Sequence, residues 1–324
     1  MRCGRLPQNS FERLKIACGK GLAAGFMETA GGAVRISPEE TVSCAETIVH
    51  SEEDICICFH RVYAQLLSRG FMPEKLFLTL NARRRDSEKS VKEKLELIST
   101  LCAHKGIALF PVAVQTLYDQ RSVSMLMQGH IYIKAYAPKA GDKVCMAGFA
   151  GCAGTLKTLS LKKDILKERF SSFWLEKAKK AMITDNDDIF GAVSAQEAFM
   201  QPVAEGGIMA ALWDMKERLG CGFFIDRQKI LFRQETIEVC ELFDIDPYSF
   251  SGDGSMLIVC SDAEKISEKM LGAGVPFAVL GELTADNACR IKKKDEESFL
   301  DRPAEDGIWK IADISWKDKE EDLL

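Results

Sequence analysis

Two short glycine-rich stretches carry the residue types that could hold a negatively charged ligand. They cover positions 151–155 and 205–207, and each one precedes a segment with helical spacing of its apolar residues. Glycine lets a backbone approach a ligand closely, and free N–H groups at a helix start attract anions. The alternative is that these glycines only allow a helix and a strand to pack closely. If a ligand site exists, we expect it between the domains, at Gly151, Gly154, Thr155, Glu205, Gly206 and Gly207.

The sequence lacks the motifs of zinc sites, thioredoxin-like sites and Walker A phosphate loops. The 12 cysteines are scattered without a CxxC pair, and there are 4 histidines, so the sequence indicates neither a zinc site nor a thioredoxin-like site. Buried free thiols in a reducing compartment explain the cysteines better. Gly19-Lys20-Gly21 does not complete a Walker A loop. We therefore predict no catalytic residue and no metal ligand.

Composition and charge narrow the function classes further. The chain has 324 residues, 47% of them hydrophobic, which suffices for two domains with separate cores. The net charge is only -5, so no global field favours nucleic acid. No stretch approaches the roughly 18 apolar residues that a membrane span requires, and the first residues lack the apolar core of a signal peptide. We expect a cytoplasmic protein that binds neither nucleic acid nor membrane.

The second half of the chain alternates helical and strand patterns. Apolar residues at helical spacing follow Gly207 and stop at Gly220, and Ser261 with Glu264 forms a predicted capping box. A second capping box, Ser194 with Glu197, predicts a short helix. Strands are predicted at 143–150, 223–226, 256–260 and 277–280, and helices at 157–182, 208–219, 233–243 and 261–272.

The first half shows a second set of helices and strands. Helices are predicted at 10–17, 52–70 and 87–105, and strands at 41–50, 76–80, 107–117 and 122–137. The strand 107–117 is apolar on both faces, which is typical of a strand covered on both sides. A polar connector at 137–142 contains proline and glycine. We therefore divide the chain into domains 1–138 and 139–324.

Four blocks between 205 and 284 resemble a known family. The strings EGGIMAALWDM, RQETIEVCELFDIDPYSF, SGDGSMLIVCS and FAVLGELT are similar to the C-terminal domain of the AIR synthase (PurM) superfamily, in particular its HypE-like, AIR synthase-related branch. The residues 139–155 resemble the entry to that domain. The resemblance implies an α/β (α+β) fold of two PurM-like domains: an N-terminal mixed sheet with helices and a C-terminal α/β domain.

The same resemblance implies binding of ATP and Mg²⁺ through acidic residues of the N-terminal domain, but this sequence departs from that pattern. An Asp is expected where Ser43-Cys44-Ala45-Glu46 stands, and an Asn-Asp pair where Ala64-Gln65 stands. A GGHT segment is expected at 113–116, where only the threonine, Thr116, is kept, and an HDxTEGG segment is expected at 201–207, where only Glu-Gly-Gly is kept. Glu46 or Glu28 could replace a lost ligand. HypE-like enzymes typically end in a reactive cysteine, whereas residues 320–324 of this sequence read EEDLL.

Two functions remain open. The first is a catalytically degenerate relative that binds a partner or a small, possibly anionic, molecule and needs no cofactor. The second is an ATP-dependent enzyme with an atypical nucleotide site and Mg-ATP as its cofactor. Metal-dependent nucleotide binding distinguishes the two.

A homodimer through the N-terminal sheet is also predicted. The strand pair 107–117 and 122–137 carries apolar residues on the face opposite its core, namely Leu126, Tyr132 and Tyr136. Large apolar surfaces usually mark an interface. The resemblance implies the same arrangement, in which two N-terminal sheets form a shared barrel around a two-fold axis. The alternative is that the segment 19–36 covers this face.

Overall fold

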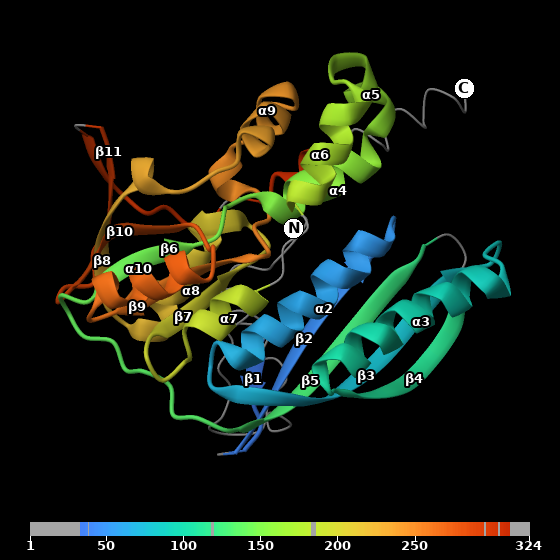
Figure 1. Ribbon diagram of the computed structural model, residues 1–324, viewed down its shortest axis with the longest axis horizontal. Coiled ribbons are helices and arrows are strands. Elements are labelled where there is room, and N and C mark those ends of the chain that lie inside the picture. Colours follow the sequence, from blue (N-terminus) through green and yellow to red (C-terminus); the bar gives the residue numbers. More distant parts are fainter. Residues whose placement is uncertain are drawn as a thin grey trace.

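Two sheets with their helices make up the protein. The computed structural model describes residues 33–37, 39–117, 120–182, 186–294, 296–303 and 305–311. The two sheets form separate halves that meet along one helix, α2 (Figure 1). The predicted helix 10–17 and the glycine-rich segment 19–32 lie outside the described residues.

The first sheet has five strands in the order β1-β2-β5-β3-β4. All neighbours are antiparallel except β3 and β4, which are parallel. Two helices, α2 (Glu52–Leu67) and α3 (Glu88–Lys105), cover one face (Figure 1). The strands are β1 (Ala33–Arg35), β2 (Glu40–Ile48), β3 (Phe71–Arg83), β4 (Ala108–Leu117) and β5 (Ser122–Ile131).

The core of this half follows from alternation along the strands. Leu76, Leu78 and Leu80 of β3 are fully buried and lie on the helical face, as do Met125 and Met127 of β5. The helices are limited by local signals. Ser87 accepts a hydrogen bond from the Ser90 N–H at 3.2 Å where α3 begins, and Gly106 ends it in the left-handed conformation.

Two strand predictions in this half are wrong. β4 is an edge strand that pairs with β3 alone and is mostly exposed, with Val112 at 64%. Its apolar residues on both faces are therefore not a sign of cover on both sides. β5 ends at Ile131, short of the predicted 137. Tyr136 instead lies against the second half, where its hydroxyl donates to Asp142 at 2.9 Å.

The second sheet has seven strands in the order β12-β11-β8-β10-β6-β9-β7. Its neighbours are antiparallel except for β8 and β11. The strands are β6 (Lys143–Ala147), β7 (Phe199–Val203), β8 (Gly222–Asp226), β9 (Ser255–Cys260), β10 (Phe277–Thr284), β11 (Cys289–Lys293) and β12 (Glu296–Phe299).

Helices cover both faces of this second sheet. Ile208, Leu212 and Met215 of α8 (Gly207–Leu219) pack on one face, and α7 (Asp187–Ala192) and α10 (Ala263–Gly272) pack on the other. The remaining elements are α4 (Cys152–Leu161), α5 (Lys163–Arg169), α6 (Ser172–Met182), α9 (Gln234–Leu242) and the 3₁₀ turns η3 (Arg227–Lys229) and η4 (Pro247–Ser249).

Local details of the second half differ from the sequence-based expectations. The predicted helix 157–182 is divided into parts of α4, α5 and α6. Asp262, one residue after the predicted cap, accepts the hydrogen bond from the Lys265 N–H at 3.0 Å. Ser194 and Glu197 do form a hydrogen bond at 3.2 Å, but a turn follows instead of a helix. The connection between the sheets, 132–142, contains the predicted domain boundary.

Leu78→Ala tests the core of the first half. Leu78 is fully buried between β3 and the helices, so its truncation should lower the free energy of unfolding by about 2–5 kcal/mol through lost burial and a residual cavity. Urea unfolding measures the change. Phe173→Ala is the control, since Phe173 is 80% exposed and its loss should cost less than about 0.5 kcal/mol. Equal losses for the two variants would contradict the assigned core.

Candidate functional site

The two predicted glycine stretches lie together at one end of the second sheet. A third segment, 250–254, connects them: the Gly154 N–H donates to the Ser251 carbonyl at 2.9 Å, and the Gly252 N–H donates to the Ala204 carbonyl at 3.2 Å. We call the three segments 148–155, 204–207 and 250–254 the glycine junction. The structure thus brings the six predicted residues into one place, and ligand binding by them stays a prediction.

Close packing accounts for several of these glycines. A Cβ atom on Gly154 would lie 2.7 Å from the ring of Phe250, which is fully buried. On Gly207, where φ is +67°, a Cβ would lie 2.6 Å from the Tyr248 carbonyl oxygen, and on Gly151, where φ is +75°, it would lie 2.7 Å from Thr236. Only glycine fits such contacts without displacement of the neighbouring segment. The two helix starts can therefore approach Phe250 from both sides.

The hydrogen-bonding groups of the first stretch are used within the fold. The Thr155 hydroxyl is fully buried, donates to the Gly151 carbonyl at 2.8 Å and lies 3.1 Å from the Thr236 hydroxyl. The Thr155 N–H donates to the same Gly151 carbonyl at 3.0 Å. A ligand at this helix start would have to compete with these contacts and with the Ser251 carbonyl on Gly154.

A carboxylate of the chain itself lies at the second helix start. Asp306 is buried and accepts hydrogen bonds from the N–H groups of Gly206 at 2.7 Å, Ser251 at 3.3 Å and Ile308 at 3.0 Å, and from the Ser251 hydroxyl. Burial raises the pKa of the Asp306 carboxyl above its ordinary value, against the effect of these hydrogen bonds, and the charge of Glu205 raises it further. Sequence analysis missed Asp306, because no local motif surrounds it.

A cation from the first half reaches the same junction. Arg61 extends from α2, and its Nε and Nη2 atoms each lie 2.8 Å from a carboxylate oxygen of Asp253. The two side chains are 13% and 7% exposed. Burial alone would lower the pKa of Arg61, but Asp253, followed by Glu205, raises it above the ordinary value. The guanidinium therefore stays charged.

The junction contains charges of both signs. The Arg61 guanidinium pairs with Asp253, and the Arg233 guanidinium lies 4.5 Å from the centre of the Phe149 ring in the first segment of the junction. The Asp306 carboxyl is buried at the second helix start. An anionic ligand, as predicted from the glycines, would therefore have to compete with Asp306 for the N–H donors there.

Two positions where the resemblance expects metal ligands lie in contact with each other. The Ser43 hydroxyl of β2 donates to the Gln65 side-chain oxygen of α2, and both residues are buried. Glu46 follows Ser43 by three positions, so it lies on the opposite face of β2 and is exposed. Glu28 lies outside the described residues. Among the described residues, no group of three or more His, Cys, Asp and Glu is arranged to hold a metal ion.

The segment 113–116, where the resemblance expects GGHT, also contributes to a network of uncharged side chains. The Gln115 amide of β4 donates to the Asn81 side-chain oxygen at 2.8 Å, and the Asn81 amide donates to the Ser122 hydroxyl at 2.8 Å. These amide and hydroxyl groups satisfy one another across three strands. They offer no negative charge to a metal ion.

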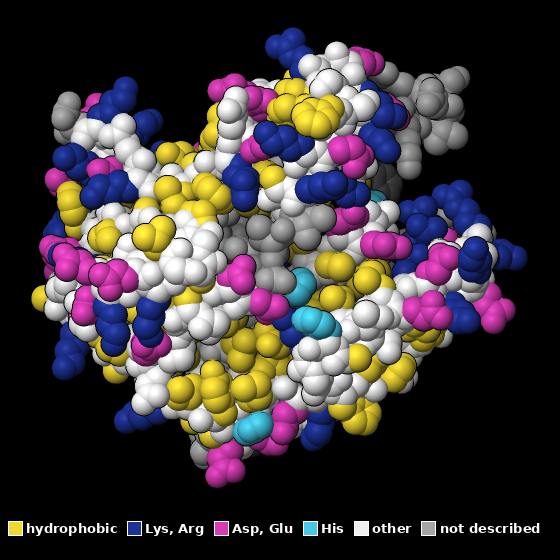
Figure 2. Space-filling model, viewed as in Figure 1, with side chains coloured by type: hydrophobic (Ala, Val, Ile, Leu, Met, Phe, Trp, Pro, Cys, Tyr) yellow, Lys and Arg dark blue, Asp and Glu magenta, His cyan; other side chains and the backbone are white. Residues whose placement is uncertain are grey.

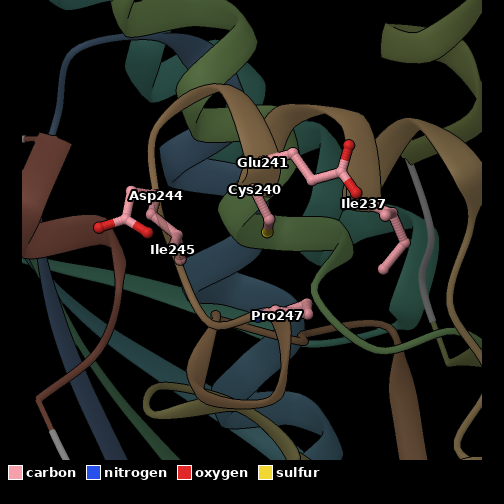
Figure 3. A pocket seen from close by; sticks show the side chains of 6 residues that line it. All are labelled: Ile237, Cys240, Glu241, Asp244, Ile245 and Pro247. Atoms are coloured by element: carbon pink, nitrogen blue, oxygen red, sulfur yellow. The ribbon is translucent and has the colours of Figure 1, made fainter.

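A cavity of about 380 Å³ is lined by side chains of α9 and of the segment that follows it (Figure 3). Glu241 and Asp244 are its charged lining residues. Burial raises the pKa of the Cys240 thiol to about 12, which makes it a poor nucleophile. The lining residues are Ile237, Cys240, Glu241, Asp244, Ile245 and Pro247.

The surface shows no field of one sign in the view of Figure 2, where Lys and Arg side chains alternate with Asp and Glu. This mixture agrees with the small net charge and gives no support for nucleic-acid binding. Among the described helices, none is long and apolar enough to cross a membrane.

Comparison with known proteins relates the fold to HypE and ThiL. No known protein-family model matches the chain. Carbamoyl dehydratase HypE from Rhodobacter capsulatus is 24% identical over 96 residues, which is 28% of this chain and 28% of that relative. A chain in the crystal structure of a HypE–HypF complex matches 90% of this chain and 99% of its own length, with a TM-score of 0.69 and 16% identity. AaThiL complexed with AMPPCP and TMP matches 93% and 98%, with a TM-score of 0.67 and 14% identity.

These similarities define the class: the protein has the two-domain PurM-like fold, as predicted from the sequence. Within that class, the resemblance to HypE is confirmed by the sequence match and by the HypE structures together. The sequence match spans little more than a quarter of the HypE relative. A match of this length does not transfer the activity of HypE to this chain.

Gly154→Ala tests the packing of the junction. The added methyl group would meet the buried Phe250 ring, so the variant should lose about 1–3 kcal/mol of folding free energy through overpacking. Thermal and urea unfolding measure the loss. Gly191→Ala on α7 is the matched control, because nothing lies within 4 Å of its Cβ position, and it should be neutral or slightly stabilising. An unchanged Gly154→Ala would contradict the contact with Phe250.

Proposed function

We propose that the protein is a HypE-like binding protein that lacks Mg-ATP chemistry and acts by binding a partner protein or a small molecule. The hydrogen bond between Ser43 and Gln65 carries this proposal. Mg²⁺ in a nucleotide site needs carboxylates to complete its octahedral shell and to balance its charge. A buried hydroxyl and a buried amide supply no charge, and here each already has the other as its partner.

The remaining expected positions support the same proposal. Gln115, Asn81 and Ser122 form a neutral network, and the described residues contain no carboxylate cluster for a metal. The residues present therefore do not fit a Mg²⁺ ion with its triphosphate. An ATP-dependent enzyme with an atypical site is the second candidate, because similar folds bind nucleotides: the compared structures include HypE in complex with ATP and AaThiL with AMPPCP.

Mg-ATP should not stabilise the protein. A ligand that binds only the folded state stabilises it by about 2.7 kcal/mol at a hundredfold excess over its Kd, so a working site would raise the Tm clearly at millimolar Mg-ATP. We expect no rise by differential scanning fluorimetry and no heat of binding by calorimetry. Magnesium alone and ATP with EDTA are the controls. A rise that EDTA abolishes would refute the proposal in favour of the ATP-dependent enzyme.

We further propose that the protein is a homodimer joined through the open face of its N-terminal sheet. A row of apolar side chains crosses this face in direct cross-strand register: Cys44 pairs with Leu126, Leu126 with Phe77, and Phe77 with Phe110. The Phe77 and Phe110 rings stack at 5.3 Å. Cys44 is exposed, Phe110 is 44% exposed and Leu126 is 38% exposed. An apolar row of this kind supports an interface between two copies.

Leu126→Glu should shift the protein toward the monomer. A carboxylate in the middle of the apolar row would be buried without a partner in the dimer, which costs several kcal/mol of association. Size exclusion with light scattering at micromolar concentration should give twice the 36.0 kDa chain mass for the wild type and a lower mass for the variant. Leu271→Glu is the control, since Leu271 is 80% exposed on α10. A wild-type mass near 36.0 kDa would refute the dimer.

We propose that the binding partner is a protein, without naming a particular one. A HypE chain has been solved in complex with the protein HypF, which supports a protein partner for a chain of the same fold. A small anionic ligand at the six predicted glycine-junction residues is proposed only as an alternative, since it must compete with Asp306. A cytoplasmic location is proposed because the described cysteines are free thiols, which suit a reducing compartment.

A further inference from the structure

The pair of Arg61 and Asp253 connects the two domains at the candidate site. Arg61 belongs to α2 of the first half and Asp253 to the middle segment of the glycine junction, 192 positions later. The two N–H groups of the guanidinium point to the two oxygens of one carboxylate, each at 2.8 Å. This bidentate geometry is the most directional form of an ion pair.

Bidentate geometry distinguishes this pair from the other charged contacts that the structure describes between the domains. Lys179 and Glu53 are 2.6 Å apart, but the lysine side chain is 40% exposed. Lys105 pairs with Asp187 through its single nitrogen, and the Asp187 side chain is 37% exposed. The Lys157 side chain is only 15% exposed, but its nitrogen lies 3.8 Å from Asp54. Exposed pairs contribute little, whereas breaking a buried pair with close hydrogen bonds leaves an uncompensated charge.

The segment that Arg61 holds is the one that joins the glycine stretches. Ser251 and Gly252, directly before Asp253, make the backbone hydrogen bonds to Gly154 and Ala204. A displacement of Asp253 would therefore pull on both bonds.

We propose that Arg61 is a positioning residue of the glycine junction. Arg61 holds the segment 250–254 in the conformation that joins the two glycine stretches. The geometry of the site therefore depends on the position of α2. The Asp253 carboxylate binds a guanidinium group, and Arg61 supplies that group from within the chain. A ligand or partner that enters the junction from between the domains has to displace Arg61 first. The inference goes beyond the proposed function, because it holds whether or not nucleotide binds.

Arg61→Ala should loosen the junction. Hydrogen–deuterium exchange, followed by mass spectrometry on the peptides that contain Gly154 and Gly252, should become about tenfold faster in the variant, because local opening sets amide protection. Arg290→Ala is the matched control: Arg290 pairs with Asp286 at 2.6 Å on the exposed β11, and its loss should change exchange at the junction by less than roughly twofold.

Chemical rescue of Arg61→Ala distinguishes a specific guanidinium-binding site from a general effect of the substitution on stability. Low-millimolar methylguanidinium chloride should restore the protection of Arg61→Ala, while sodium chloride at the same ionic strength should not. Arg61→Lys should restore part of it, because an ammonium group keeps the charge but not the two parallel hydrogen bonds. If the folded Arg61→Ala variant exchanges like the wild type, or if sodium chloride rescues it equally, the inference is wrong.

Asp253→Asn gives a second test that keeps the shape of the side chain. It removes the charge that binds Arg61, so exchange at Gly154 and Gly252 should rise as in Arg61→Ala, and methylguanidinium should have no effect. This variant decides the question if Arg61→Ala does not fold. Unchanged exchange in folded Asp253→Asn would overturn the inference, and the Mg-ATP measurement on the wild type remains independent of either result.

Discussion

The structure of the candidate site depends on the placement of one buried ring, that of Phe250. Gly154 and Gly207 lie against it or its backbone from two helix starts, and the Cβ position of Gly307 lies 3.3 Å from the ring. Phe250 is fully buried, so any side chain at these glycines would have to displace a large aromatic group or a rigid backbone segment. The glycines bring α4, α8 and the C-terminal segment together, and the hydrogen bonds of Ser251 and Gly252 follow from that approach.

The same close approach explains why carboxylates gather there. The N–H groups of Gly206, Ser251 and Ile308 converge, and buried N–H groups need acceptors. Asp306 supplies them. Its burial raises its pKa and places it beside Glu205, and the guanidinium of Arg61 offsets part of the resulting negative charge. The backbone donors thus account for the buried carboxylate at this place.

The parts of this structure that are encoded in consecutive residues could be predicted. The apolar spacing and the glycines at both ends defined α8, and the alternation along 122–131 defined the core face of β5. The two glycine stretches were expected at one site because each precedes a helix whose free N–H groups could face a common ligand. Arg61 and Asp306 could not be found, because their partners lie 192 and 100 positions away and neither has a local motif. The exposure of β4 was missed for a related reason: apolar residues on both faces do not say what covers them.

The fold is retained although polar uncharged residues stand at positions where the resemblance expects metal ligands, because these residues form hydrogen bonds with one another or with a neighbouring side chain. A carboxylate buried between β2 and α2 would need a cation, whereas Ser43 and Gln65 satisfy each other and leave α2 packed on the sheet. The helix α2 contacts the second half through Arg61 and through the acidic residues at its start, Glu53 and Asp54. A cation of the chain itself therefore joins the domains at the glycine junction, and the position of the first sheet is coupled to that of the segment 250–254.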